Sequence, residues 1–456
     1  MRHGNQILFA VILGVAAVLA LRPLPGVTPD QGAVMAIVLV TLGLWGTGLL
    51  APYLSTLIFF AALLVGGLAT PETVFAGFSS AAMWLVMSGF VIGAAITGSG
   101  LGARLGAALA PHLSKSYTAL IAGLVGLGVI LSFLMPSSMG RAMVMVPLGM
   151  GLAEALGFAR GSNGRIGVAV AIAMASNLPG FAILPANIPN MVLTGASDRL
   201  LGLQLGYADY LILHFPVLGL GKSILLIWLI LRLFPATAGA SLPAQPADTG
   251  TARRVWLTVL LAMTLALWAT DKLHGINPAW IGMTLAVVLL MPRIGFVSGP
   301  GFREAVDFGT LLFVAGALAL GAVVSASGLG EVLANLVLQG LPLAPGQDFS
   351  NFIALSGLGA VTALLTTQPG VPAVLTPLAP DLAAATGLSL EAVVMTQVVG
   401  FSTVVFPYQA APLIVAMGLS KEPLSALVRV TLLTAAVTLL ILLPLDFLWW
   451  RLLGWL

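Results

Sequence analysis

Long apolar runs, separated by short polar or Pro/Gly breaks, make up most of the chain. Among them are four stretches without Asp, Glu, Lys or Arg, at 73–103, 166–197, 349–380 and 392–420. Each is longer than the about 20 helical residues that cross a hydrocarbon core. Inside lipid only helices and closed barrels satisfy the backbone, and the pattern lacks the alternating segments typical of barrels. We therefore predict an α-helical, multi-span membrane protein.

The apolar runs predict eleven transmembrane helices, near 6–21, 33–50, 52–69, 80–99, 165–197, 207–233, 254–270, 276–294, 305–326, 389–418 and 424–449. Two further apolar regions, 117–156 and 350–386, are interrupted by polar tips at 136–140 and 366–370. We interpret each as a re-entrant helical hairpin, whose tip must line a cavity or be buried in protein. The predicted fold class is an all-α polytopic membrane protein with two re-entrant hairpins.

The two halves of the chain resemble each other. The segment 93–102 (GAAITGSGLG) matches 321–330 (GAVVSASGLG) at an offset of 228 residues, and the Pro-Leu pair at 147–148 recurs at 377–378. The copies lie five predicted spans apart, so the second enters the membrane upside down, as in the inverted repeats of alternating-access transporters. The alternative is chance similarity between small-residue membrane helices.

This duplication and the distribution of basic residues predict the domains and the orientation. We divide the chain into an N-terminal helix and loop (1–32), a first inverted repeat (33–234), a linker (235–253) and a second inverted repeat (254–456). With a cytoplasmic N-terminus, eleven Lys and Arg residues fall in cytoplasmic segments and four on the other side. Because cytoplasmic loops are rich in Lys and Arg, we predict a plasma (inner) membrane protein with a cytoplasmic N-terminus and linker.

Composition narrows the function classes. Apolar residues make up 59% of the chain and charged residues 7%, against about a quarter charged in soluble domains. The net charge of +3 is explained by topology rather than by nucleic acid, and the absence of Cys excludes thiolate metal sites and Cys nucleophiles. Residues 1–21 lack a cleavage site at Leu21, Arg22 and Pro23, so we interpret them as the first span. Without a Walker motif, HExxH or a carboxylate pair in the membrane, we predict no enzyme and no cofactor.

The hairpin tips are the first candidate site. Each tip places hydroxyls and free backbone N–H groups where a helix begins, and the positive end of the helix dipole attracts anions. Two such tips would face each other at mid-membrane. The alternative is a proline kink in an ordinary span. The predicted anion-binding residues of the tips are Ser137, Ser138, Thr366, Thr367 and Gln368.

The second candidate is a pair of proline-containing breaks in the spans that follow the hairpins, at 184–190 and 406–412. Paired prolines remove backbone hydrogen bonds and unwind a helix. The freed carbonyls could coordinate a cation or close around the substrate, although a simple kink needs no ligand. The predicted site residues of the breaks are Asn187, Pro189, Asn190, Pro407 and Gln409.

Arg141 lies one turn beyond the first tip. An intramembrane charge is expensive and commonly functional, and next to an anion site it could pair with a carboxylate, sulfonate or sulfate oxygen. The alternative is an arginine that snorkels to the interface or bonds a hairpin carbonyl. For Lys222 a helix partner or snorkelling is expected, and His214 is interpreted as a packed residue.

With its two hairpins, inverted repeat and polar tips followed ten residues later by proline, the chain resembles the divalent anion/sodium symporter (DASS) family of the ion transporter superfamily. The Ser-Asn-Thr motif of that family aligns with residues 137–139 and 367–369, which adds Met139 to the candidate site. The family's proline-containing break is similar to residues 187–190. In both tips the Asn and Thr of the motif are replaced.

The resemblance implies a secondary active transporter of small divalent or organic anions, such as di- or tricarboxylates, sulfate or sulfonates. It further implies elevator-type alternating access, a homodimer, and coupling to sodium or to anion exchange. A sodium ion would lie near Ser137, Ser138, Thr367 and Gln368, unless the Arg141 guanidinium supplies that charge. One alternative is a cation/proton antiporter or metalloid-anion permease of the superfamily, which needs an intramembrane acid that the sequence does not offer. The other is a non-transporting membrane scaffold.

Overall fold

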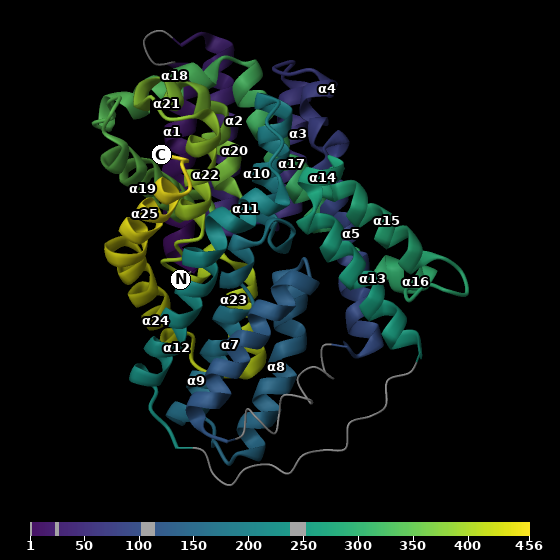
Figure 1. Cartoon of the computed structure of the whole chain (residues 1–456). Helices are drawn as coiled ribbons and strands as arrows, with labels where there is room; N and C mark the ends of the chain where they lie inside the picture. Colours follow the sequence, from purple (N-terminus) through teal and green to yellow (C-terminus); the bar gives the residue numbers. More distant parts are fainter. Residues whose placement is uncertain (1, 23–26, 102–114, 238–251) are drawn as a thin grey trace.

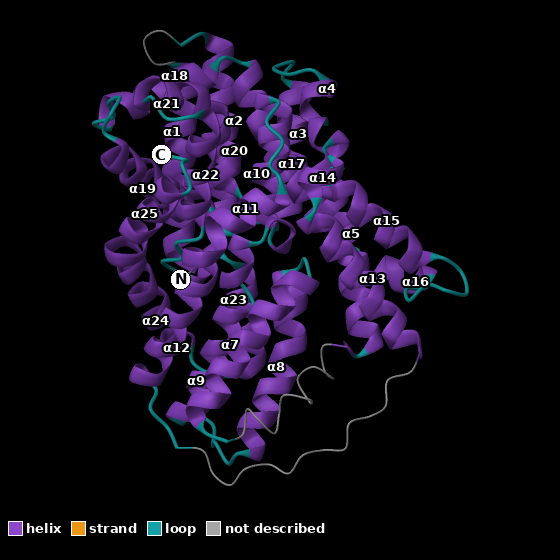
Figure 2. Cartoon of the chain, viewed as in Figure 1, coloured by secondary structure: helices purple, strands orange, loops and turns teal. Residues whose placement is uncertain are grey.

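The computed structural model describes residues 2–22, 27–101, 115–237 and 252–456, which form helices and loops without a strand (Figure 2). Within these residues eight helices are long and apolar enough to cross a membrane. The number becomes nine when Gly370–Thr386 and Leu390–Phe401, bent by 119° at a short break, count as one span. Four of the eleven predicted spans, starting near residues 6, 52, 254 and 276, fall on shorter apolar helices. The predicted all-α polytopic fold class is confirmed.

The helices follow one another in a similar order in the two halves. The first half contains α1 (Arg2–Leu21), α2 (Pro29–Thr47), α3 (Pro52–Val65), α4 (Pro71–Val74), α5 (Ala81–Ser99), α7 (Tyr117–Leu134), α8 (Ser138–Ala155), α9 (Asn163–Ala175), α10 (Ile188–Leu201), α11 (Tyr207–His214) and α12 (Lys222–Leu233). The second half contains α13 (Ala252–Ala269), α14 (Asp271–His274), α15 (Pro278–Leu290), α16 (Gly299–Ala305), α17 (Phe308–Ala326), α18 (Leu329–Gly340), α19 (Asp348–Thr366), α20 (Gly370–Leu375), α21 (Ala379–Thr386), α22 (Leu390–Phe401), α23 (Ala411–Ser420), α24 (Leu424–Val437) and α25 (Leu443–Leu452).

Serine caps set the starts of the helices that build the centre. In α5, α7, α8, α9 and α22 a serine side chain immediately before the helix accepts a hydrogen bond from a backbone N–H of the first turn. Such an N-cap contributes about 1 kcal/mol. These polar residues interrupt otherwise continuous apolar sequence, so they fix where each helix begins. The capping serines are Ser80, Ser116, Ser137, Ser162 and Ser389.

The residues of the two predicted hairpins form helices with a short break at each tip. In the first, α7 and α8 are separated by residues 135–137, and in the second, α19 and α20 by residues 367–369. Figure 1 shows α7 and α8 in the lower part of the molecule and α19 and α21 in the upper part. The inversion of the second repeat stays a prediction.

The core centres on α9 and α22, the spans that follow the hairpins. Residues 167–175 and 392–401 are buried without interruption. Glycines allow the first hairpin arms to approach them closely: a Cβ on Gly128 of α7 would lie 2.6 Å from the Ala175 carbonyl oxygen, and one on Gly400 of α22 would lie 2.6 Å from Cα of Gly359 in α19. Each hairpin is therefore held against the broken span of its own half.

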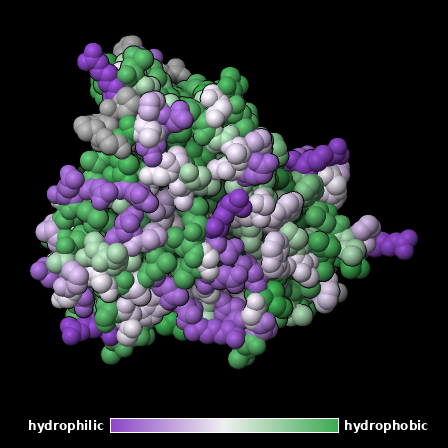
Figure 3. All heavy atoms as spheres, turned by 90° about the horizontal axis from the view of Figure 1, so that it is seen from above, coloured by the Kyte–Doolittle hydropathy of each residue, from purple (hydrophilic) through white to green (hydrophobic). Residues whose placement is uncertain are grey.

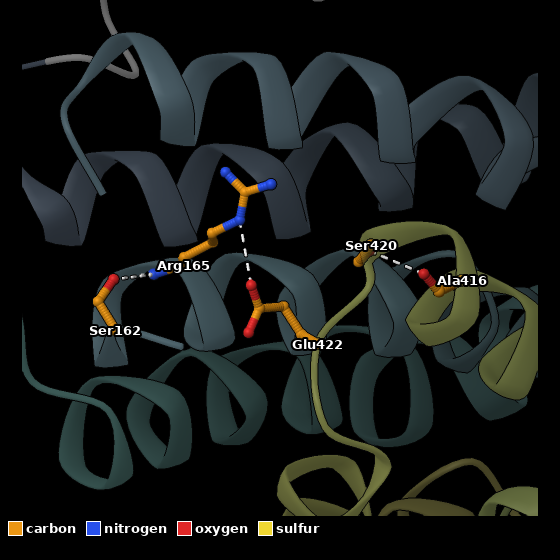
Figure 4. A network of polar contacts seen from close by, with 5 residues as sticks. All are labelled: Ser162, Arg165, Ala416, Ser420 and Glu422. Atoms are coloured by element: carbon orange, nitrogen blue, oxygen red, sulfur yellow. Dashed lines mark hydrogen bonds and ion pairs between the residues drawn. The ribbon is translucent and has the colours of Figure 1, made fainter. Parts of the chain in front are cut away.

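An ion pair joins the two halves of the chain (Figure 4). The Arg165 Nε donates to Glu422 Oε1 at 3.1 Å, from the first turn of α9 to the loop after α23, and both side chains are largely buried. Most of the predicted linker 235–253 lies outside the described residues. Seen from the upper end of Figure 1, hydrophilic side chains are spread among hydrophobic ones (Figure 3), as expected where spans leave a membrane.

Candidate functional site

The first hairpin tip contacts the break that follows α9. The Ser137 hydroxyl caps α8 by accepting from the Gly140 backbone N–H at 3.1 Å. The neighbouring Ser138 hydroxyl donates to Oδ1 of Asn187 at 2.6 Å, across 49 residues of sequence. The structure thus brings together one predicted residue from the tip and one from the first break.

Arg141 is the centre of this contact. Its side chain is fully buried, and its head group donates five hydrogen bonds. One goes to the Ser176 carbonyl, at 2.8 Å from Nε. The other acceptors are the carbonyl oxygens of Met135 and Ala186, the hydroxyl of Ser138 and Oδ1 of Asn187. Since a guanidinium has five N–H donors, every one of them is used within the protein.

The first break is held open by amide side chains. The Asn187 Nδ2 donates to the Asn177 carbonyl at 3.1 Å, and the Asn190 Nδ2 donates to the carbonyls of Gly180 and Ile183. These bonds replace the helical ones that α9 and α10 cannot make here, because prolines interrupt the ladder. Both predicted asparagines are therefore buried parts of the break.

The second tip is built differently. Thr366 bonds back to its own helix, at 2.8 Å from the Thr362 carbonyl, while Thr367 has a φ of 87°. Positive φ is uncommon for a residue other than glycine, and such strain collects at functional sites. Gln368 follows with an exposure of 3%, and its Nε2 has no hydrogen-bond partner.

The second break carries a similar amide. The Gln409 Oε1 accepts from the backbone N–H groups of Val405 and Phe406, both at 2.8 Å, which leaves its buried Nε2 without a partner. Pro407 is buried at the start of the same turn. The Tyr408 hydroxyl donates to the Leu364 carbonyl, so the break lies against the end of α19. The second tip and the second break thus each contribute one buried amide donor without a partner, Gln368 and Gln409.

Helix packing connects the four segments. The return arm α8 of the first hairpin packs against α23, which follows the second break, and α20 of the second hairpin packs against α10, which follows the first break. Each hairpin therefore supports the break of the opposite half. Among the predicted residues Met139 is exposed, at 36%, and Pro189 is buried in the first turn of α10.

One expectation from the sequence is wrong. The sequence suggested that no acidic residue is buried in a membrane span. However, Asp446 of α25, in the last apolar span, is 0% exposed. Its position near the end of an apolar run, before Trp449 and Trp450, is typical of an interfacial residue, and this concealed it. Lys222 does have a helix partner, because its Nζ donates to the Ser402 carbonyl and hydroxyl at 2.9 Å. His214 is a packed residue, as predicted.

A helical membrane protein with two polar hairpin tips and two opposed broken spans belongs to the class of membrane transporters. The chain is a member of the family described by the sodium:sulfate symporter transmembrane region, which matches residues 2–456. This membership confirms the resemblance found in the sequence motifs.

Known proteins match most of the length of the chain. A membrane protein of Cupriavidus necator is 26% identical over 485 residues, covering 98% of this chain and 93% of that protein. The YdaH transporter of Alcanivorax borkumensis has a similar fold, with a TM-score of 0.57, 19% identity, and coverage of 88% of this chain and 89% of YdaH. MtrF of Neisseria gonorrhoeae has a TM-score of 0.58, 14% identity, and coverage of 90% and 97%. At these identities the two structures establish the fold.

Proposed function

We propose that this transporter carries small divalent or organic anions, of the di- or tricarboxylate, sulfate or sulfonate class, by elevator-type alternating access. The observation that carries the proposal is the pair of buried amide groups without partners, Gln368 and Gln409, one at the tip and one at the break of the second half. An anion can accept the hydrogen bonds that these groups lack, and an unmade bond of a buried donor is costly.

Arg141 adds a fixed positive charge on the side of the first tip. All its N–H groups are bonded within the protein, so it attracts the anion through space and positions Ser138 and Asn187. This arrangement does not fit a sodium ion at the first tip, because the Ser138 hydroxyl already accepts from the guanidinium and the Ser137 hydroxyl already accepts from the Gly140 backbone N–H. We therefore expect anion transport that does not need sodium there. A homodimer remains the expected assembly.

The test is transport by purified protein in liposomes, with radiolabelled succinate, citrate, sulfate and an organosulfonate, each with and without a sodium gradient. Saturable uptake of one anion that internal anion accelerates and sodium leaves unchanged is expected. Accumulation that requires sodium would overturn the assigned role of Arg141. Absence of binding and flux for every anion in a widened screen would favour the scaffold alternative.

A further inference from the structure

Lys222 and Asp446 are two buried charged residues outside the candidate anion site, and α25, which carries Asp446, packs against the segment Phe215–Gly221 that ends immediately before Lys222. Their side chains are 1% and 0% exposed. They lie 224 residues apart, close to the 226 residues between the helix ends Ser176 and Ser402. They lie in α12 and α25, the last helices of the two halves.

A similar backbone irregularity precedes both residues. A π-helical segment, Phe215–Gly221, ends immediately before Lys222, and a second one, Thr438–Leu442, ends four residues before Asp446. The two π segments contact each other. Such segments are rare and are found frequently at functional sites. A π segment thus precedes each of the two buried charged residues, and the two segments pack against each other.

Lys222 is attached to the end of the second broken span. Its ammonium donates to the carbonyl and hydroxyl of Ser402, the C-cap of α22, while Arg141 donates to the carbonyl of Ser176, the C-cap of α9. A built-in cation thus stabilises the negative dipole end of each broken span. The two cations differ in chemistry, because arginine keeps its proton in proteins whereas a buried lysine can release it.

Asp446 has no such anchoring. Neither carboxylate oxygen accepts a hydrogen bond of normal geometry, although Lys222 and the Trp450 indole lie near enough to influence its charge. An ionised carboxylate at this depth needs a countercharge, and addition of a proton removes that need. The third fully buried ionisable group beside the pair is His214 of α11, whose ring packs on Trp450 at 5.7 Å between centroids.

Other ionisable groups leave the pair isolated. A buried tyrosine, Tyr210 of α11, packs against His214 and donates to the Phe181 carbonyl. The charged side chains on the elements packed against α12 and α25, and on these helices themselves, are each at least partly exposed in the described part of the chain. They are Arg165, Asp209, Arg232, Asp348, Arg429 and Arg451.

We propose that Lys222 and Asp446 form a proton-binding site that couples anion transport to a proton gradient; this rests on the proposed function and names its coupling ion. When the pair opens toward one side, a proton from water adds to a carboxylate oxygen of Asp446. The Lys222 ammonium then loses its counterion and is held by Ser402 alone. Release of the same proton on the other side restores the pair of opposite charges.

The first experiment compares wild type, Asp446→Asn and Asp271→Asn in liposomes. Asp271 is a buried carboxylate in α14 that accepts from the Tyr207 backbone N–H, so it controls for the removal of any buried acid. Radiolabelled succinate, citrate and sulfate are assayed as exchange without a gradient and as uptake driven by an imposed pH gradient. We expect Asp446→Asn to retain exchange and to lose the gradient-driven uptake, and Asp271→Asn to retain both. Gradient-driven uptake by Asp446→Asn at the wild-type level would overturn the proposal.

A second measurement is independent of the anion. Infrared difference spectra between acidic and alkaline pH report a protonated carboxyl directly. We expect a titrating carboxyl band that is lost in Asp446→Asn, shifted in Asp446→Glu and kept in Asp271→Asn. A wild type that transports none of the anions yet shows this band contradicts the proposed function and retains the proton site; the absence of a band that depends on Asp446 refutes the proton site alone. Size-exclusion profiles and thermal unfolding verify that each variant is folded.

Discussion

At the scale of single residues, Arg141 connects three segments that the chain sequence keeps apart. It lies in α8, while its acceptors include Ser176 at the end of α9 and Ala186 in the break. Truncation would leave several buried oxygens unpaired, at about 1–3 kcal/mol for each one that water cannot reach. We expect Arg141→Gln to lower the unfolding temperature and to abolish anion uptake.

The variant Arg141→Lys separates charge from geometry. A lysine keeps the positive charge but has three donors in place of five, so we expect measurable uptake with a lower unfolding temperature. Liposome uptake and thermal unfolding are measured on the same preparations. Near-normal uptake by folded Arg141→Gln would show that the Arg141 guanidinium has no role in anion binding.

Gln368 and Gln409 test the anion site from the other half. Replacement by Glu keeps the side-chain shape and exchanges the unpaired NH₂ donor for oxygen, which repels an anion if it is ionised. A hydrogen bond to a charged group is worth about 1.5–3 kcal/mol, so we expect each variant to weaken anion affinity by about tenfold or more. The exposed Gln347→Glu, at the N-cap of α19, is the matched control. Equal affinities for all three variants would place the anion elsewhere.

At the scale of elements, the approach of α19 to α22 positions the second tip. Helix α19 ends at the second tip, and α22 ends at Ser402. A methyl group on Gly400 would lie 2.6 Å from Cα of Gly359, where only backbone is available to move. Since overpacking costs about 1–3 kcal/mol, we expect Gly400→Ala to lower the unfolding temperature and to weaken anion affinity.

Gly357 provides the control for this prediction. It lies in α19 two residues from Gly359, and a Cβ there meets nothing within 4 Å. Gly357→Ala should leave anion affinity unchanged, with equal or slightly higher stability because alanine favours helix. If both variants behave alike in thermal unfolding and binding, the close approach of the helices does not position the tip.

The helices and their breaks were largely predictable from the sequence, whereas the contacts between distant side chains were not. Apolar runs and the serines before them locate most helices, and the polar interruptions at Ser137 and Thr367 locate both tips. Contacts such as Lys222 with Ser402, separated by 180 residues, depend on the packing of whole spans. The burial of Asp446 was not predicted, because the local sequence around a single acid near the end of an apolar run is the same whether the acid lies at a membrane interface or in the core. The unpaired amides of Gln368 and Gln409 required the structure, since sequence does not reveal which donors lack acceptors.

At the scale of the whole molecule, the two halves should enter the membrane in opposite directions. Ala159 lies in the loop between α8 and α9, and Ala384 lies near the end of α21, before α22. Both side chains are exposed, and they are at matching points of the two hairpins. The chain has no cysteine, so a single introduced thiol can be labelled without removing others.

We expect a membrane-impermeant thiol reagent to label Ala159→Cys and Ala384→Cys from opposite faces of the membrane, with position 159 on the cytoplasmic side. The physical reason is the odd number of spans between the copies, together with the excess of Lys and Arg on one side. Labelling is compared in intact cells and in inverted vesicles, and uptake by each variant verifies that the transporter is intact. Labelling of both positions from one face would mean that the repeats are parallel. The proposed elevator mechanism would then no longer be supported by an inverted repeat.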